Sequence, residues 1–438
     1  MGDVRRGWIA SPIGFRDARL ESADFSAAMA LAVAGIPALL IGAELVGIGL
    51  DFAQLPIAVP LGAIIGAGIV GMIGRQAAAS AAPGAFLLRA PLGSIGAAVF
   101  NLARLTLTLS WATLIVDIAG GWIESALAPL GLALPDYAPA AIVAILAAIL
   151  FFNGFAWSID FIRRRMFPFV IVLTLVVVWR LLTQSDPIGG QPLRGGFLEA
   201  VDAVLGLAIL WSAFAGDAGG HGQREEETAS GLGLGYAIAT LAFVLAGAVV
   251  SRAGEFDAIA SLGGGMIGAI LLLLWVPVME IDGAGGLLAS STVSMQTLLR
   301  GIPPAAGILL AAAGAAAGSI LLDPELIRRV ITTATLVVAP ALAVLLVDCL
   351  VIRPGGYHSD ELFRWKGEYG WFNLRGVAAW VGGAAVGLWL RPDLGLIPAG
   401  PEGLPALLLG MIAAATIFWP LSQLGQRRRS RITGMRGF

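Results

Sequence analysis

The stretch LPALLLGMIAAATIFWPL, residues 404–421, contains no charged side chain and is long enough to cross the hydrocarbon layer of a membrane as one helix. Similar apolar runs follow one another along most of the 438 residues. Hydrophobic residues make up 58% of the chain and charged residues only 13%, which is too little polar surface to coat a soluble domain of this size. The sequence therefore predicts an all-α polytopic membrane protein.

Hydropathy predicts about twelve transmembrane helices, and an even number of crossings places both termini on the same side of the membrane. Nineteen of the 27 Lys and Arg residues then lie on the side of the termini, six lie on the opposite side and two lie within spans. The positive-inside rule therefore predicts a multi-pass protein of the cell (inner) membrane with both termini in the cytoplasm. The predicted spans are 26–50, 55–74, 91–120, 136–153, 166–183, 197–216, 231–251, 264–289, 303–322, 328–352, 372–391 and 403–422.

Composition argues against several classes of site. The single cysteine, Cys349, rules out a disulfide framework within one chain. His221 and His358 both fall in predicted loops and form no plausible metal cluster, so no metal site and no cofactor are expected. A net charge of −2 provides no basic footprint for nucleic acid, and the apolar runs make the lipid bilayer an expected partner.

The first span contains an internal break signal. AGIPALLIGAE (34–44) places Gly35 and Pro37 near its middle, where proline removes a hydrogen-bond donor and interrupts the helix. Unwound backbone at that depth must face protein or a water-lined cavity, so the freed carbonyls are expected to line a central cavity, although a simple proline kink is the alternative. LGLAIL (205–210) gives a weaker break signal in the sixth span, and discontinuous helices one and six are typical of transporters built from two inverted five-helix repeats.

The predicted organisation combines that repeat with what the resemblance of several motifs to a known family implies. We expect a cytoplasmic N-terminal segment, a first five-helix repeat, a second five-helix repeat, a pair of peripheral helices and a basic cytoplasmic tail. Their boundaries are 1–25, 26–183, 197–352, 372–422 and 423–438.

Several motifs, taken in order, resemble the nucleobase-cation symporter family, which includes cytosine permeases and hydantoin transporters. The resemblance covers about residues 25 to 422 and implies a LeuT-like fold, with ten core helices in a 5+5 inverted repeat plus two peripheral ones. The motifs are GLDFAQLPIAVPLGA (49–63), LLRAPLGSIGAAVFNLARLTLTLSW (87–111), AILWSAFAGD (208–217), VDCLVIRPGGY (347–357) and GWFNLRGVAAWVGGAAVG (370–387).

The resemblance also implies a function. It implies that the chain is not an enzyme but a symporter that imports a small planar heterocycle, such as cytosine, another nucleobase or a pyrimidine vitamin precursor, by alternating access. Na⁺ or H⁺ would be the coupling ion, and the monomer would be the transport unit. The alternatives are a symporter for amino acids or other small solutes on the same fold, and a membrane-embedded sensor or enzyme, because fold does not fix function.

The resemblance implies a substrate site between aromatic side chains of helices 3 and 6. Trp111 falls on the helix 3 position, and Thr108 lies one turn earlier, where cytosine permeases carry Gln. In helix 6, Leu207 and Ala208 occupy positions that are Ser and Phe in cytosine permeases, while Trp211 offers a second aromatic wall one turn later. Gly35 and Pro37 of the broken helix complete the expected site; the alternative is that both tryptophans only pack between helices.

The helix 3 and helix 6 motifs each contain a charged residue, Arg104 and Asp217. Arg104 lies within a span, where a charge must face protein or water, and we interpret it as a structural partner for a loop or a carboxylate. The family's Asp followed three residues later by Arg becomes DAGGHG (217–222), which keeps Asp217 and lacks the basic residue.

Helix 8 departs most from the family. Where relatives carry the hydroxyl and amide groups of a sodium site, the chain reads PVMEID (277–282), so Glu280 and Asp282 become candidates for cation coupling, together with Glu44 in span 1. Glu280 is also a candidate for hydrogen bonding to the substrate, and solvated carboxylates beyond the span ends are the alternative. A sodium site at Ser291 and Thr292 is the secondary alternative.

Overall fold

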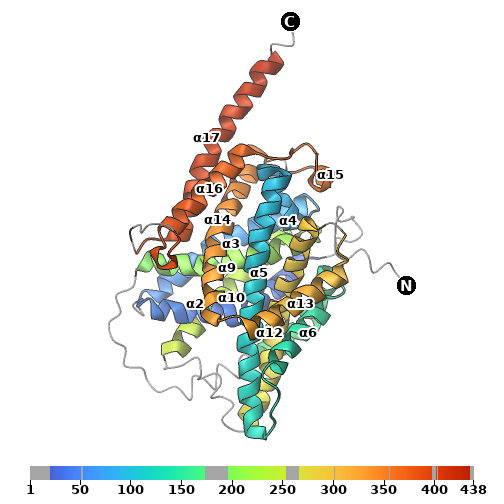
Figure 1. The fold of residues 1–438 in the computed structure, drawn as a ribbon, viewed down its shortest axis with the longest axis vertical. Helices are drawn as coiled ribbons and strands as arrows, with labels where there is room; N and C mark the ends of the chain where they lie inside the picture. The colour runs from blue at the N-terminus through green and yellow to red at the C-terminus, as the bar shows by residue number, and fades with distance from the viewer. Residues whose placement is uncertain are drawn as a thin grey trace, which may run out of the picture.

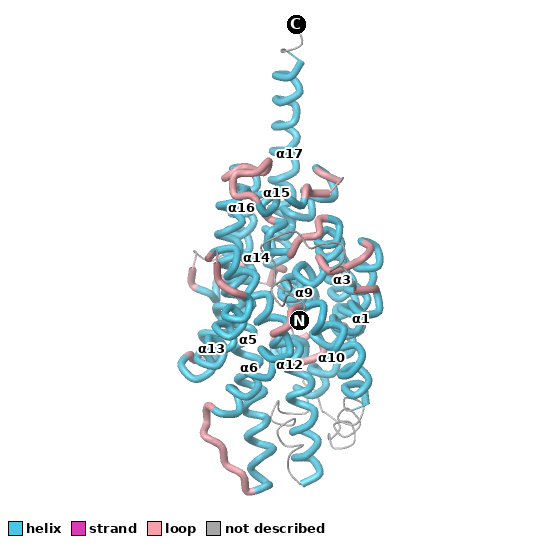
Figure 2. Tube along the Cα trace, turned by 90° about the vertical axis from the view of Figure 1, so that its right-hand side faces the viewer, coloured by secondary structure: helices cyan, strands magenta, loops and turns pink. Residues whose placement is uncertain are grey.

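The computed structural model describes residues 20–50, 53–172, 196–252, 266–299, 301–354, 356–396, 401 and 403–434. Within these ranges the chain consists of helices joined by loops (Figure 2). Leu20 and Gly222 form an isolated parallel bridge. The α-helices are α1 (Ser22–Val33), α2 (Ile36–Gly47), α3 (Leu55–Ala79), α4 (Gly84–Leu87), α5 (Arg89–Leu127), α6 (Ala138–Phe151), α7 (Phe155–Phe161), α9 (Phe197–Gly219), α10 (Glu225–Arg252), α12 (Met266–Leu298), α13 (Pro304–Leu321), α14 (Pro324–Val347), α15 (Ser359–Phe363), α16 (Leu374–Trp389) and α17 (Ala406–Gly434).

Four short 3₁₀ or π segments join these helices. They are η2 (Ala128–Leu130), η3 (Ile162–Met166), η4 (Asp348–Ile352) and η5 (Pro392–Leu394).

Eight of the described helices are long and apolar enough to span a membrane, and the number rises to ten if each of two sharply bent helix pairs counts as one span. The multi-pass architecture is therefore confirmed, whereas the number twelve is not. The predicted span 166–183 lies mostly outside the described residues, and a helix already begins at Phe155 and continues to Val172, at 105° to α6. Helix α16 is apolar but only 16 residues long.

The break in the first span is confirmed. Helix α1 ends at Val33, α2 begins at Ile36, and the two axes differ by 52°. Pro37 stands at the start of α2, where its missing N–H is one that no helix would use. The expected break in span 6 is wrong, because α9 is a continuous helix from Phe197 to Gly219. A glycine without a neighbouring proline leaves every backbone donor in place, so the helix tolerates it.

The helices pack into two groups and a peripheral set. In the first group α10 packs against α1, α2 and α3, and α3 packs against α9, while α5, α6, α12 and α13 form a second cluster. Helix α14 packs along α5, at the centre of Figure 1, and also against α16 and α17. The far end of α17 extends beyond the rest of the molecule (Figure 1). We call the first cluster the α9 group and the second the α5 group.

Candidate functional site

A large cavity opens into the end of the bundle opposite the start of α1. Its volume is 1190 Å³, and its walls come from the ends of α2, α5, α9, α14 and α17 that lie at that side. We call it the vestibule. Trp111 of α5 is among its lining residues and is 7% exposed. A flat aromatic ring at the wall of an open cavity is a suitable surface for stacking a planar heterocycle.

The vestibule is acidic. Two arginines face five carboxylate side chains there, so cations are attracted to the entrance. Arg391 donates two hydrogen bonds of 2.8 Å to Asp393 and lowers the pKa of that carboxyl from its ordinary value, which keeps Asp393 charged. The charged lining residues are Glu44, Asp117, Glu199, Asp202, Asp393, Arg328 and Arg391.

Glu280 lies at the break of the first helix. Its Oε1 accepts a 2.9 Å hydrogen bond from the backbone amide of Ile36, the first residue of α2. In an unbroken helix that amide would donate to the Ala32 carbonyl, so the Glu280 carboxylate takes over a bond that the break has freed. The side chain is 1% exposed, and Gly35 leaves room for it, because a Cβ at that position would lie 2.9 Å from Oε2. Glu280 therefore caps α2 from the α5 group.

The backbone at the break is expected from the sequence to line the central cavity, but none of the described residues that line the vestibule comes from the break. Among the described residues around the vestibule, those from the first span are Leu40, Ile41, Ala43, Glu44 and Ile48, all farther along α2 than the break. The reason is that α12 packs against α1, so that Glu280 fills the space at the break.

Thr108 and Ser291 contact each other rather than the vestibule. Their hydroxyl oxygens are 2.8 Å apart, and Thr108 also donates to the Arg104 carbonyl. Thr292 donates to the Leu288 carbonyl at 2.9 Å. The three hydroxyl groups are buried, and each has a protein partner in this structure.

The three helix 6 residues of the expected site lie in the packed interior. Leu207, Ala208 and Trp211 are each 0% exposed and are not part of the described vestibule lining. The Trp211 ring packs edge-on against Phe214 and lies close to Gly283 of α12. This structure therefore separates Trp211 from the cavity that Trp111 lines, because the face of α9 that lines the vestibule carries Glu199, Asp202, Ala203 and Gly206, and Trp211 lies on another face.

Two buried polar atoms close to this region have no hydrogen-bond partner among the described residues. They are Nε1 of Trp211 and Oδ2 of Asp282. The other Asp282 oxygen accepts from the Gly283 amide at 2.9 Å. Unsatisfied buried groups are costly, so such atoms mark places where water, an ion or a rearranged conformation completes the bonding. Sequence reasoning identified Asp282 and Trp211, but not their unsatisfied state.

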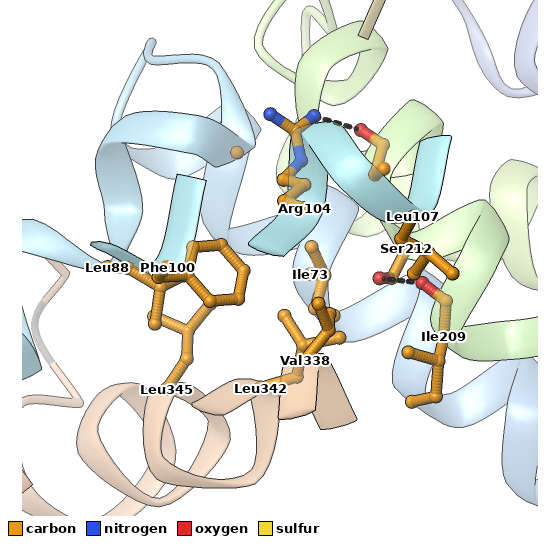
Figure 3. Close-up of a pocket in the computed structure, with 12 residues that line it drawn as sticks. Ile73, Leu88, Phe100, Arg104, Leu107, Ile209, Ser212, Val338, Leu342 and Leu345 are labelled. Carbon is orange, nitrogen blue, oxygen red and sulfur yellow. Dashed lines mark hydrogen bonds between the residues drawn. The ribbon is translucent and has the colours of Figure 1, made fainter. Parts of the chain in front are cut away.

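Arg104 has the carboxylate partner that the sequence suggested. Its guanidinium group forms a buried ion pair with Asp217 and also donates to Ser294 Oγ at 2.9 Å and to the Ala213 carbonyl at 3.1 Å. Figure 3 shows Arg104 among the residues that line the small cavity beside it. Sequence reasoning found both charges but did not pair them, because they are 113 positions apart.

Comparisons with known proteins agree with this architecture. Two structures of Mhp1, described as a nucleobase-cation-symport-1 family transporter, share the fold. The one with bromovinylhydantoin bound has a TM-score of 0.76 at 15% identity and covers 94% of each chain. The inward-facing one has a TM-score of 0.71 at 18% identity, covering 95% of this chain and 93% of that one.

A Na⁺-coupled sialic acid symporter in a substrate-bound outward-open state also matches. Its TM-score is 0.64 at 10% identity, with 93% of this chain and 90% of that chain covered. The predicted LeuT-like fold is thereby confirmed. No curated protein sequence gives a significant match.

Family membership rests on a match between the sequence and a protein-family model, and not on these distant structures. The model of the permeases for cytosine/purines, uracil, thiamine and allantoin matches residues 19–400, which is most of the chain. The protein therefore belongs to this permease family, and it is a multi-pass membrane transporter of small heterocyclic compounds and not an enzyme.

Proposed function

We propose that this protein imports a small planar heterocycle together with a proton, by alternating access. The substrate enters through the vestibule and stacks on Trp111, one of two tryptophans, with Trp122, among its described lining residues. Mhp1, which shares the fold, was solved with a bromovinylhydantoin, a compound with a flat ring. Cytosine, other nucleobases and pyrimidine vitamin precursors are candidate substrates, because each presents a flat ring with donor and acceptor edges.

Proton coupling rests on one observation, the hydrogen bond from the Ile36 amide to the buried Glu280 carboxylate. An ionised carboxylate is stabilised at a helix N-terminus by the exposed amides and the helix dipole. Protonation removes that charge and weakens the contact between α12 and α2. Loading and releasing one proton would therefore change how firmly the broken helix is held to the α5 group, which links the proton to the conformational cycle.

Sodium coupling is the second candidate. One structure that shares the fold is a Na⁺-coupled sialic acid symporter, and Ser291 and Thr292 are the hydroxyl groups that the sequence offers for such a site. In this structure those hydroxyls bond to Thr108 and to the Leu288 carbonyl, so a sodium ion would have to displace these partners. Asp282 and Glu44 remain further candidates for cation coupling, Asp282 because one oxygen is unsatisfied and Glu44 because it faces the vestibule.

Uptake into proteoliposomes tests the proposal. Radiolabelled heterocycle should accumulate under an inward proton gradient and should not respond to external Na⁺. Glu280→Gln cannot release a proton, so gradient-driven accumulation should be lost while exchange of internal for external substrate continues. Glu124→Gln, an exposed carboxylate on α5, is the matched control and should transport normally.

A different result would exclude this role of Glu280. Uptake that strictly requires Na⁺ and survives Glu280→Gln would move the coupling site to Ser291 and Thr292. Accumulation of amino acids in place of heterocycles would instead contradict the substrate class.

We further propose that the protein works as a monomer in the cell (inner) membrane with both termini in the cytoplasm. The domain organisation proposed with it is 26–183 and 197–352 as inverted repeats and 372–422 as the peripheral pair. The excess of basic residues on the side of the termini supports this orientation.

A further inference from the structure

The Arg104 guanidinium joins three helices at the end of the bundle opposite the vestibule. Arg104 belongs to α5, its ion-pair partner Asp217 and the Ala213 carbonyl belong to α9, and Ser294 belongs to α12. Arg104 is 3% exposed and Asp217 is 1% exposed. The other Asp217 oxygen accepts from the Ala85 amide at 3.4 Å, which ties α4 to the same point.

This cluster connects the two helix groups. Helices α5 and α12 belong to the α5 group, whereas α9 belongs to the α9 group. The end of α9 is fixed within its own group, since Gly219 approaches the Gly74 backbone of α3 so closely that a Cβ would lie 2.7 Å from the Gly74 carbonyl oxygen. The cluster therefore lies where the two groups would separate if this end of the molecule opened.

The apolar side chains around the cluster complete the closure. A small cavity of 10 Å³ lies beside Arg104, lined by Leu107 of α5, Ser212 of α9, Ile73 of α3 and Leu342 of α14 (Figure 3). The vestibule at the other end has a volume of 1190 Å³. The interface between the α5 group and the α9 group is therefore open at the vestibule and closed at the end that contains Arg104.

We propose that Arg104 and Asp217 form the lock that keeps the cytoplasmic side closed while the vestibule is open, and that the pair must separate to release substrate. The inference rests on the alternating-access function proposed above. It also accounts for DAGGHG (217–222): Asp217 takes its positive partner from α5, so a basic residue three positions later is not needed.

Breaking the pair should favour the inward-open state. Loss of one member leaves the other charge buried and uncompensated, which is strongly unfavourable unless water reaches it. Opening the cytoplasmic side supplies that water. Neutralising either residue should therefore shift the population toward open-inward molecules rather than merely loosen the fold.

Cysteine accessibility measures this shift without substrate and without any ion gradient. The native Cys349 is first replaced by serine, and Ser212→Cys is introduced beside the lock. A membrane-impermeant maleimide is then applied to oriented vesicles from each side. Asp217→Asn and Arg104→Gln should each raise the labelling rate from the cytoplasmic side at least ~10-fold, a shift of about 1.4 kcal/mol in the closed-to-open equilibrium. Ser294→Ala, which removes one hydrogen bond, should give a smaller increase in the same direction.

Arg164→Gln is the matched control. Arg164 forms an exposed ion pair with Asp160 four residues away, so its loss should leave labelling unchanged. Folding is checked by size-exclusion chromatography. If the charge variants fail to fold, the labelling rate of Ser294→Ala from the cytoplasmic side tests the proposal in their place.

Labelling rates within twofold of the parent in the folded variants would overturn the lock and leave the proposed transport function untouched. Proton-independent uptake combined with faster labelling would reject the proton coupling and retain the lock.

Discussion

At the scale of single residues, Trp111 is the side chain that we propose as the stacking surface for the substrate. Trp111→Ala removes that aromatic ring from the vestibule, and we expect the affinity for a planar substrate to fall by more than roughly tenfold, a loss of about 1.4 kcal/mol. Isothermal titration of the purified protein with the transported heterocycle measures this directly. Trp419→Ala, which removes a 55% exposed tryptophan of α17, should bind as the parent does. Equal affinities in all three proteins would remove Trp111 from the site.

At the scale of elements, Glu280 approaches the break between α1 and α2 so closely that a Cβ at residue 35 would crowd its carboxylate. A Cβ on Gly35 would lie 2.9 Å and 3.0 Å from the two Glu280 carboxylate oxygens, so Gly35→Ala must push Glu280 away from the Ile36 amide. We expect coupled transport to be impaired, with a stability loss near the lower end of the ~1–3 kcal/mol typical of overpacking, because the displaced atoms are the end of a flexible side chain.

Thermal unfolding in detergent and gradient-driven uptake are the measurements. The same substitution at Gly47, on the same helix but with no atom within 4 Å of the added Cβ, is the control and should leave both unchanged. An alanine at position 35 that preserves stability and coupling would show that Glu280 does not need this contact.

At the scale of the whole molecule, the vestibule and the basic loops should face opposite sides of the membrane. In a Cys349→Ser background, Ser125→Cys at the vestibule should react with an impermeant thiol reagent only from outside. His358→Cys, at an exposed position in the loop between α14 and α16, should react only from the cytoplasm. The expected difference in rate between the two sides is on the order of 100-fold, since the intact bilayer excludes a charged reagent. The reverse pattern would invert the proposed orientation.

The sequence by itself determined the architecture. Runs of apolar residues, uninterrupted by charge, have one stable solution in a bilayer, because each backbone polar group must be satisfied within its own helix. The break at Gly35 and Pro37 was readable for the same reason, since proline removes a donor wherever it occurs in a helix. The family likewise followed from ordered local motifs, which the matching family model bears out.

Only the tertiary structure decided which side chains meet. Glu280 and the Ile36 amide are 244 positions apart, and Arg104 and Asp217 are 113 apart, so no local pattern could pair them. Trp211 and Thr108 each lie one helical turn from another residue of the expected substrate site. Packing between helices nevertheless places Trp211 against Phe214 and Thr108 within hydrogen-bond distance of Ser291. Spacing along one helix fixes the face on which a residue lies, whereas the helix that covers that face depends on the packing of all the others.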